Sequence, residues 1–99
     1  MIRAVFAPDF SGFSLSGHAG YADAGEDIVC AAVSAMTNLA VNGMEAFGAV
    51  AQVTAEEEGF LSYRMDNDCG EAKRLMRSFY EELAQLQNLY PKHIRVTQK

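Results

Sequence analysis

Apolar and polar positions repeat with two different periods along this chain, and the first part shows the shorter one. Residues 2–7 form a short apolar run, and residues 13–19 alternate between apolar and polar side chains. A two-residue period is typical of a half-buried strand. Residues 8–12, Pro-Asp-Phe-Ser-Gly, have turn chemistry. The two segments are therefore predicted to pair as a hairpin.

A helical period replaces the alternation from Asp27 to about Phe47. The predicted apolar stripe comprises Val29, Val33, Met36, Ala40, Met44 and Phe47, with Ile28, Ala32 and Leu39 beside it. The opposite, more polar stripe comprises Cys30, Ser34, Thr37, Asn38, Val41 and Glu45. Several small alanines in this helix favour close packing against a sheet or a second subunit.

The second half repeats the two periods in the same order. Residues 49–55 and 60–65 are predicted strands, joined by a turn at 56–59 whose three glutamates we interpret as solvated. A helix is predicted from about Cys69 to Tyr90, and Pro91 ends it. Asp68 and Glu71 have the spacing of a capping box. A last strand is predicted over residues 93–97.

These elements follow one another in the order ββαββαβ. Two helices packed on one mixed sheet of about five strands make an α+β, two-layer sandwich. A chain of 99 residues without an internal linker predicts a single domain over residues 1–99. Dimerisation would supplement the small core that a chain of this length can form.

Charge and composition exclude several classes of protein. The formal net charge is −5, which argues against nonspecific nucleic-acid binding and suits a basic protein partner. Neither a signal peptide nor a membrane span of about 20 apolar residues is evident. The two cysteines are expected to be reduced rather than paired. These features predict a cytoplasmic protein.

The strongest chemical signal lies in residues 17–34, which place His18 and Cys30 on either side of a glycine-containing loop. Cys30 falls in the first turn of the predicted helix, where the helix dipole favours an ionised, nucleophilic thiol. An imidazole can act as its base and later as the acid for the leaving group. Unpaired N–H groups at the helix start could receive an oxyanion. We expect the loop over residues 19–29 to act as a lid.

Each of these residues also has an ordinary interpretation. A free cysteine such as Cys30 is most often a small buried hydrophobe. Strict alternation places His18 on the face opposite the apolar one, unless Gly17 or Gly20 breaks the strand or the imidazole and the thiol lie at the end of the sheet rather than beneath the helix. Asp27 is interpreted first as a helix cap, with orientation of His18 or a substrate contact as alternatives. The Ser34 hydroxyl could bond near the site or back into its own helix.

Cys69 is a rival thiol, because it also opens a predicted helix. It has no histidine in its own segment, although the last strand could bring His93 back toward it. Two cysteines and two histidines without paired spacing predict neither a metal site nor a cofactor.

The stretch from His18 to Ala22, followed by Gly25 to Ser34, resembles the ribosomal-processing cysteine protease family, Prp. The resemblance implies that Cys30 is the nucleophile and His18 the general acid and base. It also places Asp27 and Ser34 near the site, with Gly20 and Gly25 in the loop that moves when substrate binds. Members form homodimers.

The family's activity, as the resemblance implies, is removal of a short N-terminal extension from a large-subunit ribosomal protein in Firmicutes and related bacteria. Cleavage follows a hydrophobic, phenylalanine-containing stretch and precedes a small residue. The expected partner is thus a ribosomal protein precursor. A noncatalytic module that binds a ribosomal protein or an assembly intermediate is the alternative, and thiol-dependent acyl transfer to another acceptor is a third, weaker option.

Overall fold

The computed structural model describes residues 1–23, 25–56 and 59–99. Its elements are β1 (Ile2–Phe6), β2 (Gly12–Ser16), α1 (Ile28–Ala46), β3 (Ala51–Glu56), β4 (Phe60–Met65), α2 (Gly70–Leu89) and β5 (Ile94–Gln98). The predicted order ββαββαβ is confirmed, and most boundaries fall within two residues of the expected ones. Strand β2 differs most, because it ends at Ser16 rather than at Ala19.

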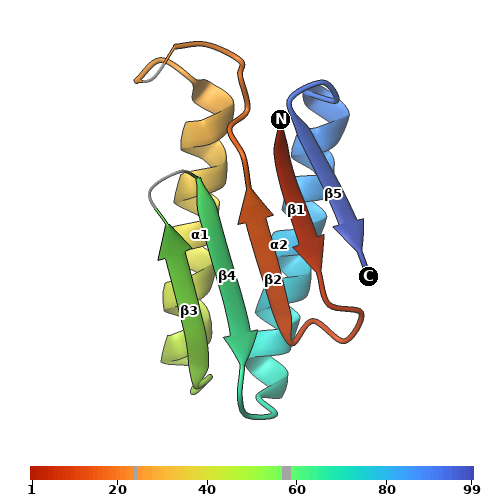
Figure 1. The fold of residues 1–99 in the computed structure, drawn as a ribbon. Coiled ribbons are helices and arrows are strands. Elements are labelled where there is room, and N and C mark those ends of the chain that lie inside the picture. Colours follow the sequence, from red (N-terminus) through yellow and green to blue (C-terminus); the bar gives the residue numbers. More distant parts are fainter. Residues whose placement is uncertain (24, 57–58) are drawn as a thin grey trace.

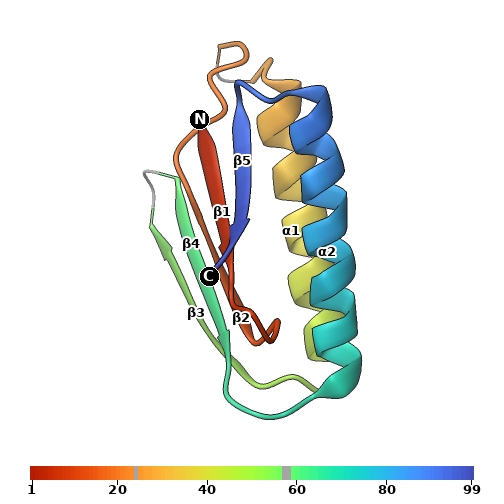
Figure 2. The same cartoon turned by 90° about the vertical axis from the view of Figure 1, so that its right-hand side faces the viewer.

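The five strands form one mixed sheet in the order β3-β4-β2-β1-β5. Strand β5 runs parallel to β1, with Ile2 opposite Ile94, whereas the other neighbouring strands pair antiparallel. Both helices cover the same face of this sheet (Figures 1 and 2). The predicted α+β, two-layer architecture is therefore correct, and no helix formed by the described residues covers the other face of the sheet.

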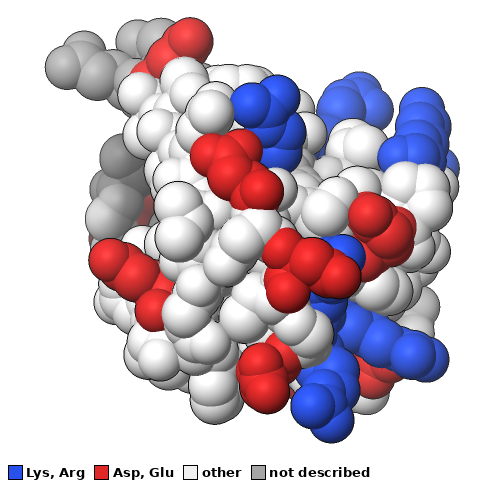
Figure 3. Space-filling view, turned by 90° about the horizontal axis from the view of Figure 1, so that it is seen from below, with Lys and Arg blue, Asp and Glu red and all other residues white. Residues whose placement is uncertain are grey.

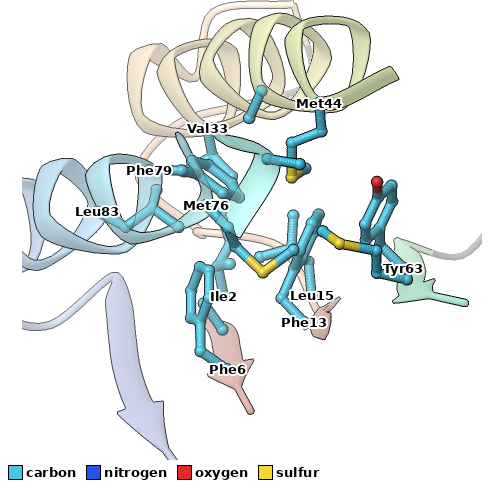
Figure 4. Close-up of a cluster of buried hydrophobic side chains, with 14 of the residues drawn as sticks. Ile2, Phe6, Phe13, Leu15, Val33, Met44, Tyr63, Met76, Phe79 and Leu83 are labelled. Carbon is cyan, nitrogen blue, oxygen red and sulfur yellow. The ribbon is translucent and has the colours of Figure 1, made fainter. Parts of the chain in front are cut away.

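The hydrophobic core fills the space between the sheet and the two helices (Figure 4). Alternate residues of the strands point toward the helices, so that Phe6 stacks on Phe13 with 5.5 Å between the ring centroids. Phe79 of α2 meets both rings edge-on. This rigid aromatic cluster fixes the distance between the two layers.

The buried face of α1 is rotated slightly from the predicted stripe. Thr37, predicted on the polar face, is buried, and its Oγ1 donates to the Val33 carbonyl oxygen at 2.6 Å. Leu39 and Phe47 were expected on or beside the apolar stripe, yet they are 73% and 55% exposed. The hydroxyl of Thr37 can enter the core because the helix backbone satisfies its hydrogen bond.

The predicted capping box of the second helix is wrong. The N-cap of α2 is Cys69, and no side chain caps this helix. Asp68 lies one residue too early, and its carboxylate binds the Lys73 ammonium at 2.9 Å instead. The spacing of Asp68 and Glu71 alone does not show whether Asp68 is the N-cap or lies one residue before it and forms an ion pair.

By length and composition alone, helix α1 is also long and apolar enough to cross a membrane, contrary to the expectation from the sequence. This is weak evidence for a span, because a helix that packs on a core passes the same test. Here five of its residues are buried, namely Val29, Val33, Thr37, Ala40 and Met44.

The solvated turn predicted at residues 56–59 includes Glu57 and Glu58, which lie outside the described residues. That interpretation therefore stays a prediction. The two flanking strands do pair as a hairpin, with Glu56 opposite Phe60.

Candidate active site

The candidate site lies at the end of the sheet where the chain leaves β2 and crosses to the start of α1 (Figure 1). Cys30 is the third residue of α1 and is partly exposed. It packs against the edge of the core without entering it fully. The thiol therefore occupies the first helical turn, as the sequence predicted.

Gly17 decides the direction of His18. It has a φ of +85°, and its N–H donates to the Gly59 carbonyl oxygen at 2.9 Å. A Cβ at Gly17 would collide with the Met1 carbonyl oxygen, so only glycine fits this turn. Alternation stops at this residue, and His18 lines the same pocket as Cys30. The sequence alone had allowed two explanations for a shared site, a break in the strand at a glycine or a position at the end of the sheet.

The pocket beside Cys30 has a volume of about 350 Å³. Its polar lining residues, besides Cys30, are His18, Ser34, Thr37, Asn38 and Glu56. Its apolar lining residues are Ile2, Leu15, Val33, Phe60 and Leu61. This combination can hold an apolar side chain next to a nucleophile.

A second cavity of about 580 Å³ adjoins the first and shares His18, Cys30 and Ser34 with it. The loop supplies most of its other lining residues, which are Gly20, Ala22, Gly25, Asp27 and Ala31. All six residues that the sequence analysis assigned to the site therefore line one of these two cavities. An extended segment could pass from one cavity to the other across the thiol.

The sulfur of Cys30 accepts a hydrogen bond from the backbone N–H of Ala19 at 3.4 Å. Ala19 directly follows His18 and is 2% exposed. The sequence pattern gave no indication of this contact.

Asp27 caps α1, as the sequence analysis favoured. One carboxylate oxygen accepts from the N–H groups of Val29 and Cys30, both at 3.0 Å. The other accepts from Tyr21 at 3.0 Å and from Ala22 at 3.4 Å. The hydrogen bond from the Cys30 N–H, with the others behind it, lowers the pKa of Asp27 below its ordinary value.

These bonds correct the expectation about the helix start. The N–H groups of Val29 and Cys30 already bind the Asp27 side chain, and that of Ala31 binds the Asp27 carbonyl oxygen at 3.0 Å. They are therefore not free to receive an oxyanion in this conformation. Among the described residues, Asp27 makes no hydrogen bond to His18. It caps the helix and tethers the loop. It also lines the second cavity, and a contact with the substrate stays a prediction.

Ser34 lies one turn after Cys30 on the exposed side of α1. Within the described residues its hydroxyl makes no hydrogen bond back into the helix, in contrast to Thr37. It is therefore available to a molecule in the pocket.

Two residues near the site were not singled out for it by sequence reasoning. The ring nitrogen Nδ1 of His93 lies 3.0 Å from the Ala19 carbonyl oxygen, across 74 residues of sequence. A Cβ at Gly59 would lie 3.0 Å from both Cε1 and Nε2 of His18. Neither contact has a local pattern, because strand pairing brings these segments together.

The rival thiol Cys69 lies at the other end of the helical layer, where α2 begins (Figure 1). It is 8% exposed, and its Sγ donates to the Phe47 carbonyl oxygen at 3.3 Å. His93 is held at the opposite end by Ala19. The thiol and histidine that share a pocket are therefore Cys30 and His18.

Within the described residues, no group of three or more histidine, cysteine or acidic side chains is arranged to hold a metal ion. A thiol beside an imidazole provides a nucleophile and an acid–base group. Attack on an acyl carbon is one reaction that this pair of groups can perform.

Comparisons with known proteins point to one family. A family model described as cysteine protease Prp matches residues 1–95. An essential ribosomal processing protease Prp from S. aureus, solved with a covalently linked product peptide, is 24% identical, with a TM-score of 0.94 and 100% of each chain covered.

Two further solved structures share the fold. The S. aureus protease in complex with a substrate peptide is 22% identical, with a TM-score of 0.83 and 100% of each chain covered. SMU.848 from Streptococcus mutans is 24% identical, with a TM-score of 0.78, over 99% of this chain and 93% of that one. A search of curated proteins found no match to this chain. At these identities the structural matches show the fold alone.

Proposed function

The chain belongs to the cysteine protease Prp family, and we propose that it removes the N-terminal extension of a large-subunit ribosomal protein by attack of the Cys30 thiolate. The observation that carries the proposal is the pocket at the start of α1 that both Cys30 and His18 line. Cys30 lines both of these cavities together with His18, and Cys69 lines neither of them.

In the proposed mechanism, His18 takes the proton of the Cys30 thiol, and the thiolate attacks the scissile carbonyl carbon. The carbonyl electrons move to oxygen and then return as the C–N bond breaks. His18 gives its proton to the leaving amine, and a thioester to Cys30 remains. Water then attacks the thioester, releases the new carboxyl terminus and restores the thiol.

The shape of the site supports a peptide with an apolar segment before the cleaved bond. The first cavity has the volume and the apolar lining to take an aromatic side chain, and Cys30 lines the same cavity. The S. aureus relatives were solved with peptides. A phenylalanine-containing stretch followed by a small residue fits this arrangement.

Asp27 supports the site by tying the loop to the helix start. Its bonds to the N–H groups of Tyr21 and Ala22 hold the loop, and its bonds to Val29 and Cys30 hold the helix. Gly20 and Gly25, with φ of +67° and +88°, allow the turns of the loop between them. Ser34, one turn after Cys30 in α1, lines both cavities and contacts the substrate. Movement of the loop on substrate binding breaks the two loop bonds of Asp27.

Substitution of the nucleophile tests the proposal directly. Cys30→Ala should abolish cleavage of a precursor peptide that spans the extension, while the circular dichroism spectrum and the melting temperature stay close to those of the wild type. Cys69→Ser is the matched control, because it removes the other thiol at the far end of the molecule and should leave kcat nearly unchanged.

Mass spectrometry of the products separates the alternatives. Two fragments that together account for the precursor plus one water identify hydrolysis. A transferred acyl group would indicate acyl transfer to another acceptor, and binding without cleavage would indicate a noncatalytic module. Turnover that persists in Cys30→Ala would show that the proposal is wrong.

A further inference from the structure

We propose that His93 is a positioning residue for this reaction: through a hydrogen bond to the Ala19 carbonyl, it holds the Ala19 N–H on the Cys30 sulfur and the neighbouring His18 at the pocket. The inference rests on the proposed function. It concerns a side chain from the turn before β5, far from residues 17–34 in the sequence.

The hydrogen bond itself has a defined direction. His93 Nδ1 lies 3.0 Å from the Ala19 oxygen. A carbonyl oxygen only accepts, so Nδ1 carries the hydrogen and donates it. The neutral Nδ1–H tautomer and the protonated ring both meet this requirement.

The backbone and ring of His93 are themselves fixed. Its N–H donates to the Tyr90 carbonyl oxygen at 3.0 Å, and its own carbonyl oxygen accepts from Ile2 at 2.9 Å. The imidazole meets the Tyr21 ring edge-on at 5.3 Å, and Tyr21 meets the Tyr90 ring in the same way at 5.5 Å. The backbone of the donor residue is therefore anchored to the end of α2 through Tyr90 and to β1 through Ile2, and its ring binds a residue of the loop.

Ala19 transmits this constraint to the thiol. Its carbonyl is held by His93, its N–H donates to Cys30 Sγ at 3.4 Å, and its side chain is 2% exposed. The residue before it is His18. A shift of Ala19 would weaken the bond to sulfur and move the proposed general base together with it.

The described residues also show why this support is needed. Gly17 on one side and Gly20 on the other both have positive φ, which leaves His18 and Ala19 between two permissive positions. The side of this segment that faces away from Cys30 is held by His93. A fixed constraint from outside the loop therefore sets the geometry of the dyad.

Two substitutions separate the hydrogen bond from the packing. His93→Phe keeps an aromatic ring against Tyr21 but removes the donor. His93→Asn removes the ring but places an amide N–H near the position of Nδ1. We expect His93→Phe to lower kcat and the rate of Cys30 alkylation by iodoacetamide by roughly three- to tenfold, the effect of one lost hydrogen bond. KM should stay unchanged.

His93→Asn should restore most of both rates, even where its melting temperature is lower than that of the phenylalanine variant. Alkylation is counted per Cys30 by mass spectrometry in a Cys69→Ser background. An unchanged alkylation rate in His93→Phe, or a loss of stability with kcat intact, would overturn the inference.

Alkylation needs no substrate, so it distinguishes this inference from the proposed function. A precursor that is not cleaved by the wild type would contradict the proposed function, whereas the alkylation series still tests the role of His93. Nuclear magnetic resonance of the wild type gives a second test, which does not depend on whether a variant folds. A His93 ring N–H on Nδ1 with slowed solvent exchange supports the bond, and an unprotonated Nδ1 at neutral pH refutes it.

Discussion

Four backbone N–H groups converge on the single carboxylate of Asp27, two from the loop and two from the helix start. An aspartate at this position can accept all four because each oxygen takes two donors. Asparagine offers one accepting oxygen, and alanine offers none. The negative charge also lies at the positive end of the helix dipole.

Substitutions at Asp27 should therefore separate the cap from the charge. Asp27→Ala removes the cap and should lower the melting temperature by several degrees. Asp27→Asn keeps a helix cap but loses the acceptor for the loop, so its melting temperature should lie between the other two. Thermal unfolding followed by circular dichroism at pH 7 measures both. An alanine variant as stable as the wild type would contradict the capping role.

The stabilisation by Asp27 should depend on pH in one direction. Hydrogen bonds, first of all the one from the Cys30 N–H, hold the pKa of the folded state below the ordinary 3.8. The contribution is therefore fully present above pH 3.8 and is lost as the pH falls through the folded-state pKa. The difference in melting temperature between wild type and Asp27→Ala should be constant near neutral pH and shrink below pH 3.8.

Gly59 has no side chain and so leaves room for the His18 ring. A substitution at Gly59 therefore tests whether the position of this ring matters. Gly59→Ala should push the imidazole away, because the new Cβ would lie 3.0 Å from Cε1 and Nε2. We expect Cys30 alkylation to slow by about tenfold or more, since small misplacements of a catalytic group are costly.

Gly48→Ala is the matched control for Gly59→Ala. Gly48 also has a positive φ, +102°, but a Cβ there meets nothing within 4 Å. It should cost stability of about 1–3 kcal/mol from backbone strain alone and leave alkylation unchanged. Equal alkylation rates in the two variants would show that the contact with His18 has no effect.

At the scale of single residues, local spacing decided how well the site could be predicted. Asp27 binds groups two and three positions ahead, so the sequence showed its role as a cap. Gly59 and His93 act on His18 and Ala19 across 41 and 74 residues. No pattern within one segment carries that information.

The two helices approach each other closely at Gly43. A Cβ there would lie 2.6 Å from Cδ2 of Leu75, the end of a half-buried and flexible side chain. Replacing a glycine inside a helix by alanine contributes about 1 kcal/mol through helix propensity. The contact with α2 opposes this gain.

Gly43→Ala should thus change the free energy of unfolding by less than about 1 kcal/mol in the wild-type background. In a Leu75→Ala background, where the opposing methyl is absent, the same change should stabilise the protein by about 1 kcal/mol. Urea unfolding of the four proteins measures the coupling. Additive effects would contradict the close approach of the helices.

Most helices and strands were predictable, because the repeat of apolar side chains that defines each of them lies within one segment. The errors concern features that depend on the segments packed against a helix. Thr37 was predicted on the polar face of α1, yet it is buried. Burial is possible because its hydroxyl donates a hydrogen bond to the Val33 carbonyl oxygen. Asp68 has the spacing of a cap, but the helix begins one residue later, at Gly70. Helix rotation and exact helix starts depend on what packs against the helix.

Charge on the whole molecule is mixed in sign, although the net charge is −5. The end of the molecule seen in Figure 3 carries basic and acidic side chains next to each other. The described residues include three surface ion pairs, Arg64–Asp66, Lys73–Asp68 and Arg77–Glu81. The net negative charge of the molecule would attract a basic substrate.

Such attraction should weaken with salt. For a full-length basic precursor, kcat/KM should fall severalfold between low and high ionic strength, because screening shortens the range of the field. A short neutral peptide with the same cleavage sequence is the control and should show little change. Equal salt dependence of the two substrates would rule out steering by net charge.

Homodimerisation and a place in the cytoplasm stay predictions for the whole molecule. Several large apolar side chains are exposed, including Leu39 at 73% and Val50 at 61%. Their exposure is compatible with a second subunit.

The sequence by itself determined the elements, their order, the position of Cys30 in the first turn of α1 and the cap by Asp27. These features depend on side-chain period and on hydrogen bonds between near neighbours. The tertiary structure alone decided that Gly17 breaks the strand, that His18 reaches the pocket of Cys30, and that Gly59 and His93 surround it. Those contacts follow from the strand order β3-β4-β2-β1-β5, which places distant segments at one end of the sheet.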